Sequence, residues 1–218
     1  MKKIIFAGLC CLPLSLAVAD DHPTRAYFGD THLHTSFSPD AGMAGTKVGP
    51  NEAYRFVLGE TVTSSTGQEA TISRPLDFVV IADHAENLGL ADAIANSDPG
   101  LLSDPFGKQL YDLVMAGKGI DAFNLLVQQM TKGAEAKIES DSMLRNAWTK
   151  IMDLADQYND PGEFTAFIGY EWTSQPGGSN LHRVVVFRGD KASVDPVLPF
   201  SAFDSENVED LWDYMAAY

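Results

Sequence analysis

Apolar residues form one nearly continuous run in the chain, from Pro75 to Ala82, with β-branched and aromatic residues at 78–81. A short apolar run without alternation is typical of a strand buried on both faces of a parallel sheet. Three further segments with β-rich composition between turn residues are also predicted to be strands. They are residues 25–30, 164–170 and 181–188.

Much of the chain between these segments follows a helical period instead. Residues 134–158 repeat apolar side chains every three or four positions, which predicts an amphipathic helix with a buried stripe. The expected core positions of that stripe are Met143, Leu144, Ala147, Trp148, Ile151, Met152, Leu154 and Ala155. Proline and glycine predict breaks at 98–100, 104–105 and 117–119 in a helical region that spans 85–160.

Shorter helices are predicted at 50–58 and 205–217, and no internal repeat or linker is visible. Strands that alternate with helices indicate the α/β class. We therefore expect one α/β domain over residues 20–218, with a helical insertion at about 91–160.

The first nineteen residues have the pattern of a secretory signal peptide. Lys2 and Lys3 precede an apolar core at 4–16, and a small-residue cleavage site ends at Ala19. The core is short for a membrane span. Both cysteines of the chain lie in this segment, which excludes a disulfide scaffold in the mature protein. We expect a periplasmic or secreted bacterial protein without a membrane anchor after cleavage.

The chain has 30 acidic and 15 basic residues, with a formal net charge of −15. This charge repels nucleic acids and anionic membranes at long range. It does not exclude a small anionic substrate if a metal ion dominates the local potential. A small molecule is therefore the expected partner, and the oligomeric state stays open.

His32 and His34 stand two positions apart where a predicted strand ends. Alternate residues of a strand point to the same face, so both imidazoles should converge on one point. Neutral imidazole nitrogens are good ligands for divalent transition metals. The spacing alone is a weak signal, and the positions of other ligand-type residues strengthen it.

Other ligand-type residues also lie at the ends of predicted strands: His84, Glu171 and His182. In parallel α/β barrels, functional groups gather at the carboxyl ends of the strands. Asp40 follows His34 closely enough to reach the same pocket. A carboxylate such as Glu171 can bridge two ions, so this set predicts a site for more than one metal.

Residues near these ligands have open interpretations. Asp83 should point away from His84 on a continuing strand, which favours a hydrogen-bonding role over direct coordination. Asp30 fits a structural hydrogen bond at least as well as a metal bond. Arg55, Arg74 and Arg183 are candidates for binding a substrate anion, but surface ion pairs are favoured in so acidic a chain.

The arrangement resembles the PHP (polymerase and histidinol phosphatase) superfamily of metal-dependent hydrolases. The residues that carry this resemblance are 32–40, 81–84, 169–171 and His182. Within the superfamily, the chain is similar to the exported branch called domain of unknown function 3604. The residues similar to that branch are 50–55, 64–68, 73–78 and 84–86.

The resemblance implies a distorted (β/α)₇ barrel, incomplete in this chain, with two or three manganese, zinc or iron ions. It implies that His32, His34 and Glu171 hold one metal, with Glu171 bridging, while Asp40, His84 and His182 complete neighbouring sites. Glu171, Asp40 and His84 are the residues expected to take part in catalysis. The implied reaction is hydrolysis of an ester, a phosphoester above all, by metal-activated hydroxide.

One departure from the superfamily pattern concerns the end of the chain. The pattern continues with further histidines and a late Asp-x-His, whereas this sequence stops at Tyr218. The expectation is an N-terminal portion of a longer protein, since four strands of a barrel leave an open edge. Hydrolysis of a sulfate ester or a lactone, and metal binding without catalysis, remain alternatives.

Overall fold

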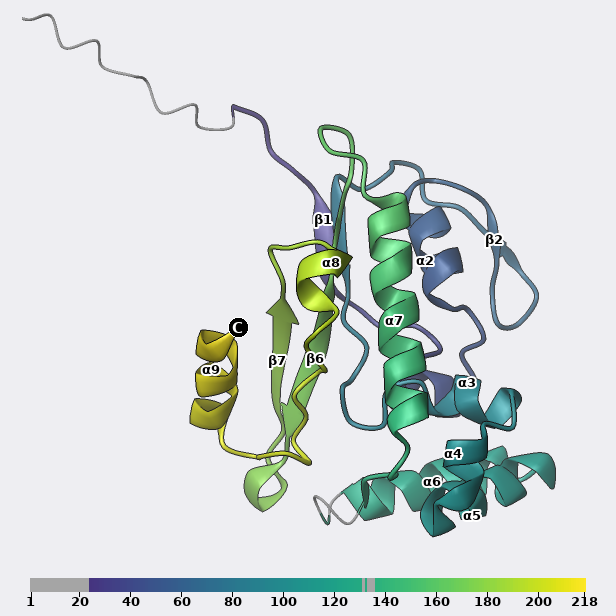
Figure 1. The fold of residues 1–218 in the computed structure, drawn as a ribbon. Coiled ribbons are helices and arrows are strands. Elements are labelled where there is room, and N and C mark those ends of the chain that lie inside the picture. The colour runs from purple at the N-terminus through teal and green to yellow at the C-terminus, as the bar shows by residue number, and fades with distance from the viewer. Residues whose placement is uncertain (1–23, 131, 133–135) are drawn as a thin grey trace, which may run out of the picture.

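The computed structural model describes residues 24–130, 132 and 136–218. The predicted signal peptide at 1–19 lies outside these residues, as does His22. Strands and helices follow one another along the described chain, and the fold is mixed α/β with a parallel sheet (Figure 1). The predicted fold class is therefore confirmed at this level.

A three-stranded parallel sheet forms the centre of the fold, in the order β1 (Gly29–Leu33), β4 (Phe78–Ile81) and β5 (Thr165–Phe167). The apolar run identified in the sequence supplies β4, the middle strand. Val79, Val80 and Ile81 are all buried. The prediction of a buried strand in a parallel sheet is thus confirmed.

Strands β6 (Gly169–Ser174) and β7 (Leu181–Val186) form an antiparallel hairpin beside this sheet. The predicted single strand over 164–170 is wrong, because the chain divides between β5 and β6 and continues to Ser174. Gly169 permits the close crossing, since a Cβ there would lie 2.5 Å from Val80 and 2.7 Å from the Val185 carbonyl. Glu171 therefore lies within a strand and not at its end.

Two segments in which no strand or helix is predicted contain short regular elements. The loop at 36–49 includes helix α1 (Pro39–Met43), and the loop at 61–73 includes a hairpin of β2 (Val62–Thr63) and β3 (Glu69–Ala70). The strand predicted at 25–30 is instead β1, because pairing with β4 begins at Gly29. Local composition does not reveal these pairings, which depend on the partner strand.

The helical region divides at the predicted breaks into α3 (Leu90–Ala95), α4 (Pro99–Ser103), α5 (Pro105–Met115) and α6 (Gly119–Met130). Helix α7 (Asp141–Tyr158) begins later than the predicted start at 134, because the Ser140 side chain accepts the Met143 N–H and caps the helix there. Two of these helices begin with proline after an aspartate cap. Asp98 accepts a hydrogen bond from the Leu101 N–H, and Asp104 accepts one from the Gly107 N–H.

The remaining helices are α2 (Pro50–Val57), α8 (Lys191–Val194) and α9 (Val208–Ala217), with a 3₁₀ turn at Pro176–Gly178. Helix α2 begins at Pro50, the start predicted from the sequence, and Gly49 precedes it. Helix α9 begins later than predicted, because the Asn207 side chain accepts the Glu209 N–H and ends the preceding turn.

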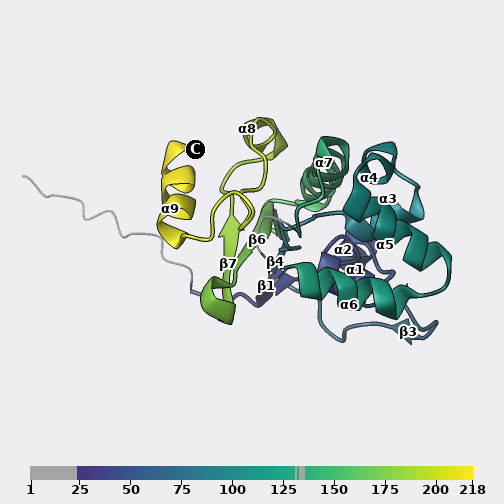
Figure 2. The same ribbon diagram turned by 90° about the horizontal axis from the view of Figure 1, so that it is seen from below.

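Helix α7 packs along the strands, with α2 and α8 beside it (Figure 1). Its predicted stripe is confirmed, since Trp148, Ile151 and Met152 are buried in the main core with residues of β4 and β6. Helices α3 to α6 gather at the end of the molecule where β1 and β4 end, seen in the view along the strands (Figure 2). This end is where the candidate site lies.

The strands of the described residues do not close into a barrel, because β1 and β5 are the two edges of the parallel sheet. The (β/α)₇ barrel therefore stays a prediction. None of the helices in the described ranges combines the length and the apolarity needed to cross a membrane.

Two glycines provide a test of how tightly α3 packs on α7. Gly89 precedes α3 with φ of 82°, and a Cβ there would lie 2.6 Å from the Ala147 Cβ, whereas Gly67 has φ of 89° with no atom within 4 Å. Gly67→Ala should lower the free energy of unfolding by about 1 kcal/mol, the cost of a left-handed alanine. Gly89→Ala should lower it by about 1–3 kcal/mol more, because α7 must shift. Urea unfolding measures both, and equal losses would contradict the packing.

Candidate metal centre

The two histidines of the His-x-His sequence point to one carboxylate, as predicted. His32 lies in β1 and His34 directly follows it. The Nε2 atoms of His32 and His34 lie 3.0 Å and 2.9 Å from Glu171 Oε2. Their ring centroids are 4.9 Å apart. The alternation of side chains along β1 thus brings both imidazoles to the same point.

Glu171 is the centre of the cluster and is fully buried. Its β6 position pairs with His84 through an isolated parallel bridge, which places the His84 Nδ1 3.2 Å from Oε2. His182, on the neighbouring strand β7, places Nδ1 2.8 Å from Oε1. Each carboxylate oxygen therefore lies close to at least one imidazole nitrogen.

Asp40 joins the cluster from the first turn of α1. Its Oδ2 lies 3.1 Å from His34 Nδ1 and 3.7 Å from His84 Nε2. The structure thus brings all six predicted ligand residues together, although their chain positions extend from 32 to 182. Three overlapping groups share these residues: His32 with His34 and Glu171; His34 with Asp40 and His84; and His84 with Glu171 and His182.

Three buried polar atoms of the cluster lack the hydrogen bonds that burial normally requires. They are both carboxylate oxygens of Glu171 and the Nε2 atom of His34, which are buried without a hydrogen-bond partner. The imidazole nitrogens nevertheless lie about 3 Å from the Glu171 oxygens. Unpaired buried polar groups are unfavourable. Ligands of one zinc-sized ion, with bonds of about 2.1 Å, have a similar separation from one another. The residues therefore fit a divalent metal site.

In the metal-free cluster, burial and neighbouring charges determine which side chains are ionised. Burial raises the pKa of Glu171, but its contacts with His34, His84 and His32 outweigh this and lower the pKa to about 2. Burial also lowers the pKa of His34, while its close contacts with the carboxylates of Asp40 and Glu171 outweigh this and raise the pKa to about 10. Without metal, His34 is therefore an imidazolium between two carboxylates, and a metal ion would replace its proton.

His84 differs from His34 in its charge. Burial lowers the pKa of His84 to about 4, despite the carboxylates of Glu171 and Asp40 nearby. The imidazole is therefore neutral at pH 7 and has one nitrogen lone pair available for coordination. The backbone N–H of His84 donates a hydrogen bond to Ser38 Oγ, and this bond holds His84 beside α1.

Asp83 and Asp30 have the structural roles that the sequence favoured. The buried Asp83 accepts hydrogen bonds from the backbone N–H and the hydroxyl of Thr35, at 2.5 Å and 2.7 Å. These bonds tie the end of β4 to the turn after His34. Asp30 accepts the His32 N–H. Burial raises the pKa of Asp83 to about 6, although the Thr35 bonds oppose this rise.

Two residues close to the ligands were missed in the sequence. Thr173 Oγ1 lies 2.9 Å from His84 Nδ1 and 3.0 Å from His182 Nδ1. Glu86 is buried and lies 3.7 Å from His84 Nδ1 through its Oε2. Each residue stands two positions after a ligand. In a strand, residues two positions apart point to the same face, so the spacing from Glu171 could have indicated that Thr173 lies near the cluster. Glu86 follows β4, where no regular period applies.

The three arginines lie outside the cluster. Arg55 forms an ion pair with Glu60 at 2.8 Å, as favoured from the sequence. Arg74 lies over the Phe28 ring, and Arg183 donates to the carbonyl of His182. Tyr170 and Trp172, which flank Glu171, are buried in the main core, as expected.

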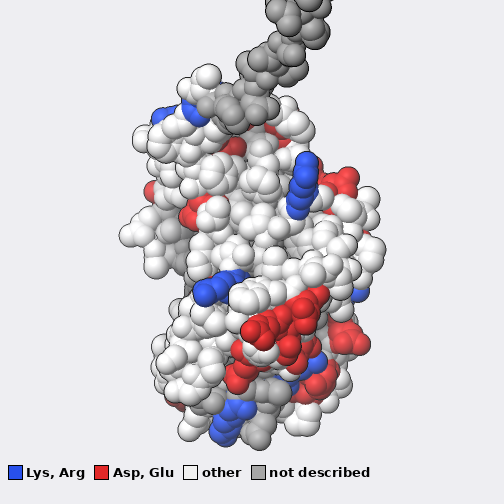
Figure 3. Space-filling model, turned by 90° about the vertical axis from the view of Figure 1, so that its left-hand side faces the viewer, with Lys and Arg blue, Asp and Glu red and all other residues white. Residues whose placement is uncertain are grey.

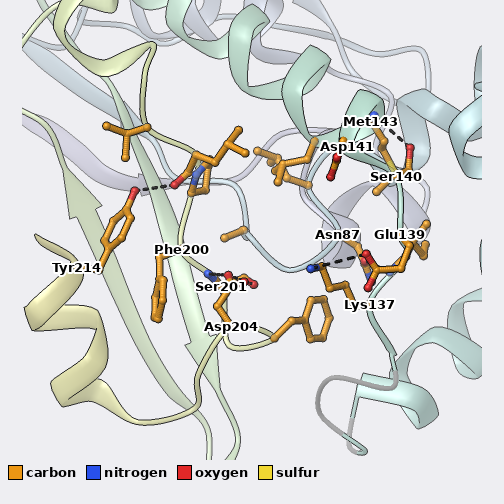
Figure 4. A pocket seen from close by; sticks show the side chains of 18 of the residues that line it. Asn87, Lys137, Glu139, Ser140, Asp141, Met143, Phe200, Ser201, Asp204 and Tyr214 are labelled. Atoms are coloured by element: carbon orange, nitrogen blue, oxygen red, sulfur yellow. Dashed lines mark hydrogen bonds and ion pairs between the residues drawn. The ribbon is translucent and has the colours of Figure 1, made fainter. Parts of the chain in front are cut away.

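A separate cavity of about 430 Å³ lies between the start of α7 and the segment 196–204 (Figure 4). Its walls are mainly apolar, with Lys137, Asp141 and Asp204 among the charged residues. Ala85 contributes to the wall, but none of the six ligand residues does. The cavity therefore lies beside the cluster and is not the metal centre itself.

The surface reflects the acidic composition. On the face shown in Figure 3, acidic side chains gather in the lower half, whereas Lys and Arg stand apart from one another. Helix α9 contributes exposed acidic residues to the surface: Glu209, Asp210 and Asp213. The expectation that polyanions are poor partners stays a prediction.

A family model described as "Protein of unknown function (DUF3604)" matches residues 21–218. The match covers most of the chain, and the protein therefore belongs to this family. No curated protein and no solved structure matched the chain.

Replacement of Glu171 tests the metal centre directly. Glu171→Gln keeps the size of the side chain but removes the charge and one acceptor from a carboxylate shared by two groups of ligands. The metal content of protein purified without chelator should fall at least tenfold, as measured by elemental analysis. The control is Glu60, an exposed carboxylate that forms an ion pair with Arg55 outside the cluster. Glu60→Gln should keep the metal content of the wild-type protein. Equal metal content in the two variants would contradict the assignment.

Metal affinity should depend on pH in a defined direction. The His34 pKa of about 10 means that this ring is protonated at pH 7.5 in the metal-free protein and must lose its proton to bind an ion. Mn²⁺ affinity should therefore rise with pH, by roughly tenfold per unit between pH 6.5 and 8.5. Calorimetry in two buffers of different ionisation enthalpy should detect about one proton released. Binding without proton release would contradict this interpretation.

Proposed function

We propose that this member of the DUF3604 family is a metal-dependent hydrolase of phosphate esters. The observation that supports the proposal is the buried Glu171 carboxylate, which lacks hydrogen bonds and lies among four imidazoles. The resemblance of the ligand sequences to those of PHP hydrolases extends the proposal from metal binding to ester hydrolysis. On the same resemblance, we propose that the observed α/β fold is part of a PHP-like barrel.

The six ligand residues would hold two or three divalent ions, with manganese, zinc and iron as the candidates. Bound ions would lower the pKa of a coordinated water toward ~7 and neutralise negative charge on a phosphoryl group. Three overlapping groups of ligands, each with one carboxylate, are compatible with more than one ion. Imidazole nitrogens with carboxylate oxygens favour zinc, manganese or iron over calcium.

The cluster has a buried floor and an accessible rim. Glu171 is fully buried, whereas the side chains of His32, His182 and Asp40 are 45%, 41% and 51% exposed. A small ester can therefore approach from the rim while the floor excludes water from the far side. The chain around the site does not need to open for a substrate to enter.

Asp40 is the residue best placed to handle a proton. Its carboxylate lies at the rim, and the contact with His34 keeps its pKa well below the usual range despite the opposing effect of burial. An ionised carboxylate at this position can orient a nucleophilic water and accept a hydrogen bond from it. His84, which is neutral at pH 7, remains free to bind an ion or a substrate oxygen through its lone pair.

Export to the periplasm or medium is part of the proposal, on the basis of the signal-like sequence at 1–19. The strongly negative chain would be compatible with small phosphate esters only where bound cations reverse the local potential.

The test is turnover of a panel of p-nitrophenyl phosphate mono- and diesters, a sulfate ester and a lactone, with Mn²⁺ or Zn²⁺ added. We expect phosphoester hydrolysis that a chelator abolishes and that added metal restores. Asp40→Asn should lower kcat on the order of 10²–10⁴-fold, because the charged proton acceptor is lost. Arg74→Gln is the matched control, since Arg74 lies over Phe28 and away from the ligands, and should leave kcat unchanged.

The other outcomes separate the alternatives. If only the sulfate ester or only the lactone is hydrolysed, the proposed substrate class is wrong and the metal-dependent mechanism stands. Metal-loaded protein that hydrolyses no member of the panel would overturn the catalytic proposal and leave metal binding as the function.

A further inference from the structure

Thr173 has an unusual position between two imidazoles of the cluster. It lies two residues after Glu171 on β6, so both side chains point to the same face of the strand. In the register of the hairpin it stands directly opposite His182. Its hydroxyl oxygen, which is buried, lies 2.9 Å from His84 Nδ1 and 3.0 Å from His182 Nδ1.

The proton positions on these two rings decide which nitrogens can bind metal. A neutral imidazole has one N–H and one lone pair. If the Thr173 hydroxyl donated to a Nδ1 atom, that ring would carry its proton on Nε2 and would have no lone pair left for an ion. If the hydroxyl oxygen accepts from both rings, which its two lone pairs permit, both Nε2 atoms remain free.

The surroundings of the two Nδ1 atoms favour the second arrangement. Glu171 Oε2 lies 3.2 Å from His84 Nδ1, and Glu171 Oε1 lies 2.8 Å from His182 Nδ1. An ionised carboxylate can only accept hydrogen bonds. Each Nδ1 therefore lies close to the negative charge of the carboxylate and within hydrogen-bond distance of the hydroxyl oxygen, and both favour a proton on Nδ1.

The opposite nitrogen of His84 agrees with this arrangement. His84 Nε2 lies 3.7 Å from Asp40 Oδ2, which is too long for a hydrogen bond. Two ligands of one ion, with bonds of about 2.1 Å, lie roughly 3–4 Å apart. The Nε2 lone pair and the Asp40 carboxylate are therefore spaced to share a cation.

We propose that Thr173 is a positioning residue that accepts Nδ1–H from both His84 and His182 and so directs both Nε2 lone pairs to metal. The proposal rests on the proposed metal centre but not on its catalytic activity. Thr173 sets the tautomers of the two rings and touches no substrate atom.

Glu86 holds the threonine in this position. Its Oε1 accepts the backbone N–H of Thr173 at 3.1 Å and that of Ala202 at 2.7 Å. A fully buried carboxylate with two N–H donors ties β6 to the segment before α9. These bonds fix the backbone of Thr173, and therefore the point on β6 from which its hydroxyl reaches the two rings.

The experiment compares wild type with Thr173→Val, Thr173→Ser and Ser174→Ala. Valine has the shape of threonine without the hydroxyl, and serine restores the hydroxyl. Ser174 is the matched control, because its hydroxyl is also buried but has no hydrogen-bond partner among the described residues. Long-range ¹H–¹⁵N spectra of histidine-labelled, metal-free protein at about pH 8 report the tautomer of each ring.

We expect His84 and His182 to be Nδ1–H tautomers in wild type, Thr173→Ser and Ser174→Ala, and to shift toward Nε2–H in Thr173→Val. Zn²⁺ affinity should fall about 10–100-fold in Thr173→Val alone. If His84 and His182 are Nε2–H tautomers in the wild-type protein, that result alone overturns the proposal. Unchanged tautomers and Zn²⁺ affinity in folded Thr173→Val would also overturn it. Absence of turnover in every protein would overturn only the proposed hydrolase.

Discussion

The buried carboxylate of Glu171 is the constraint on which the rest of the structure depends. An ionised carboxylate in the interior is strongly unfavourable unless opposite charge surrounds it. Here the surroundings are imidazoles from β1, the end of β4 and β7. These strands must end or begin at the same place for the charge to be compensated. The position of the hairpin β6–β7 beside the parallel sheet meets this requirement.

A set of hydrogen bonds to backbone groups keeps these strand ends together. Asp83 binds the turn at Thr35, Ser38 binds the His84 N–H, and Glu86 binds the N–H groups of Thr173 and Ala202. Side chains adjacent to the ligands thus connect β1, α1, the end of β4 and β6. Such preorganisation matters because metal affinity depends on ligands held at fixed separations before the ion binds.

The accessible rim and the buried floor have different chemical consequences. Groups at the rim, such as Asp40 and His32, exchange with solvent and can meet a substrate. The floor keeps Glu171 ionised and His84 neutral, so both present lone pairs to a cation. This division is consistent with the proposed hydrolysis, in which ions lie between a protein floor and a soluble ester.

The sequence by itself determined the local features of this protein. The hydrophobic pattern predicted β4 and α7, because burial of one face or of both faces determines where apolar residues occur along a segment. Proline and glycine predicted the helix breaks. The His-x-His spacing predicted two convergent rings for the same reason. The six ligand residues were identifiable from their types and from their places near predicted strands.

Only the tertiary structure decided how these parts meet. The division of 164–170 into β5 and β6, and the antiparallel partner of Glu171, depend on contacts between strands that are distant in the chain. The Thr173 hydroxyl between His84 and His182 depends on the register of that hairpin. Strand register and pairing are set by packing against a partner, and a single segment of sequence does not contain that information.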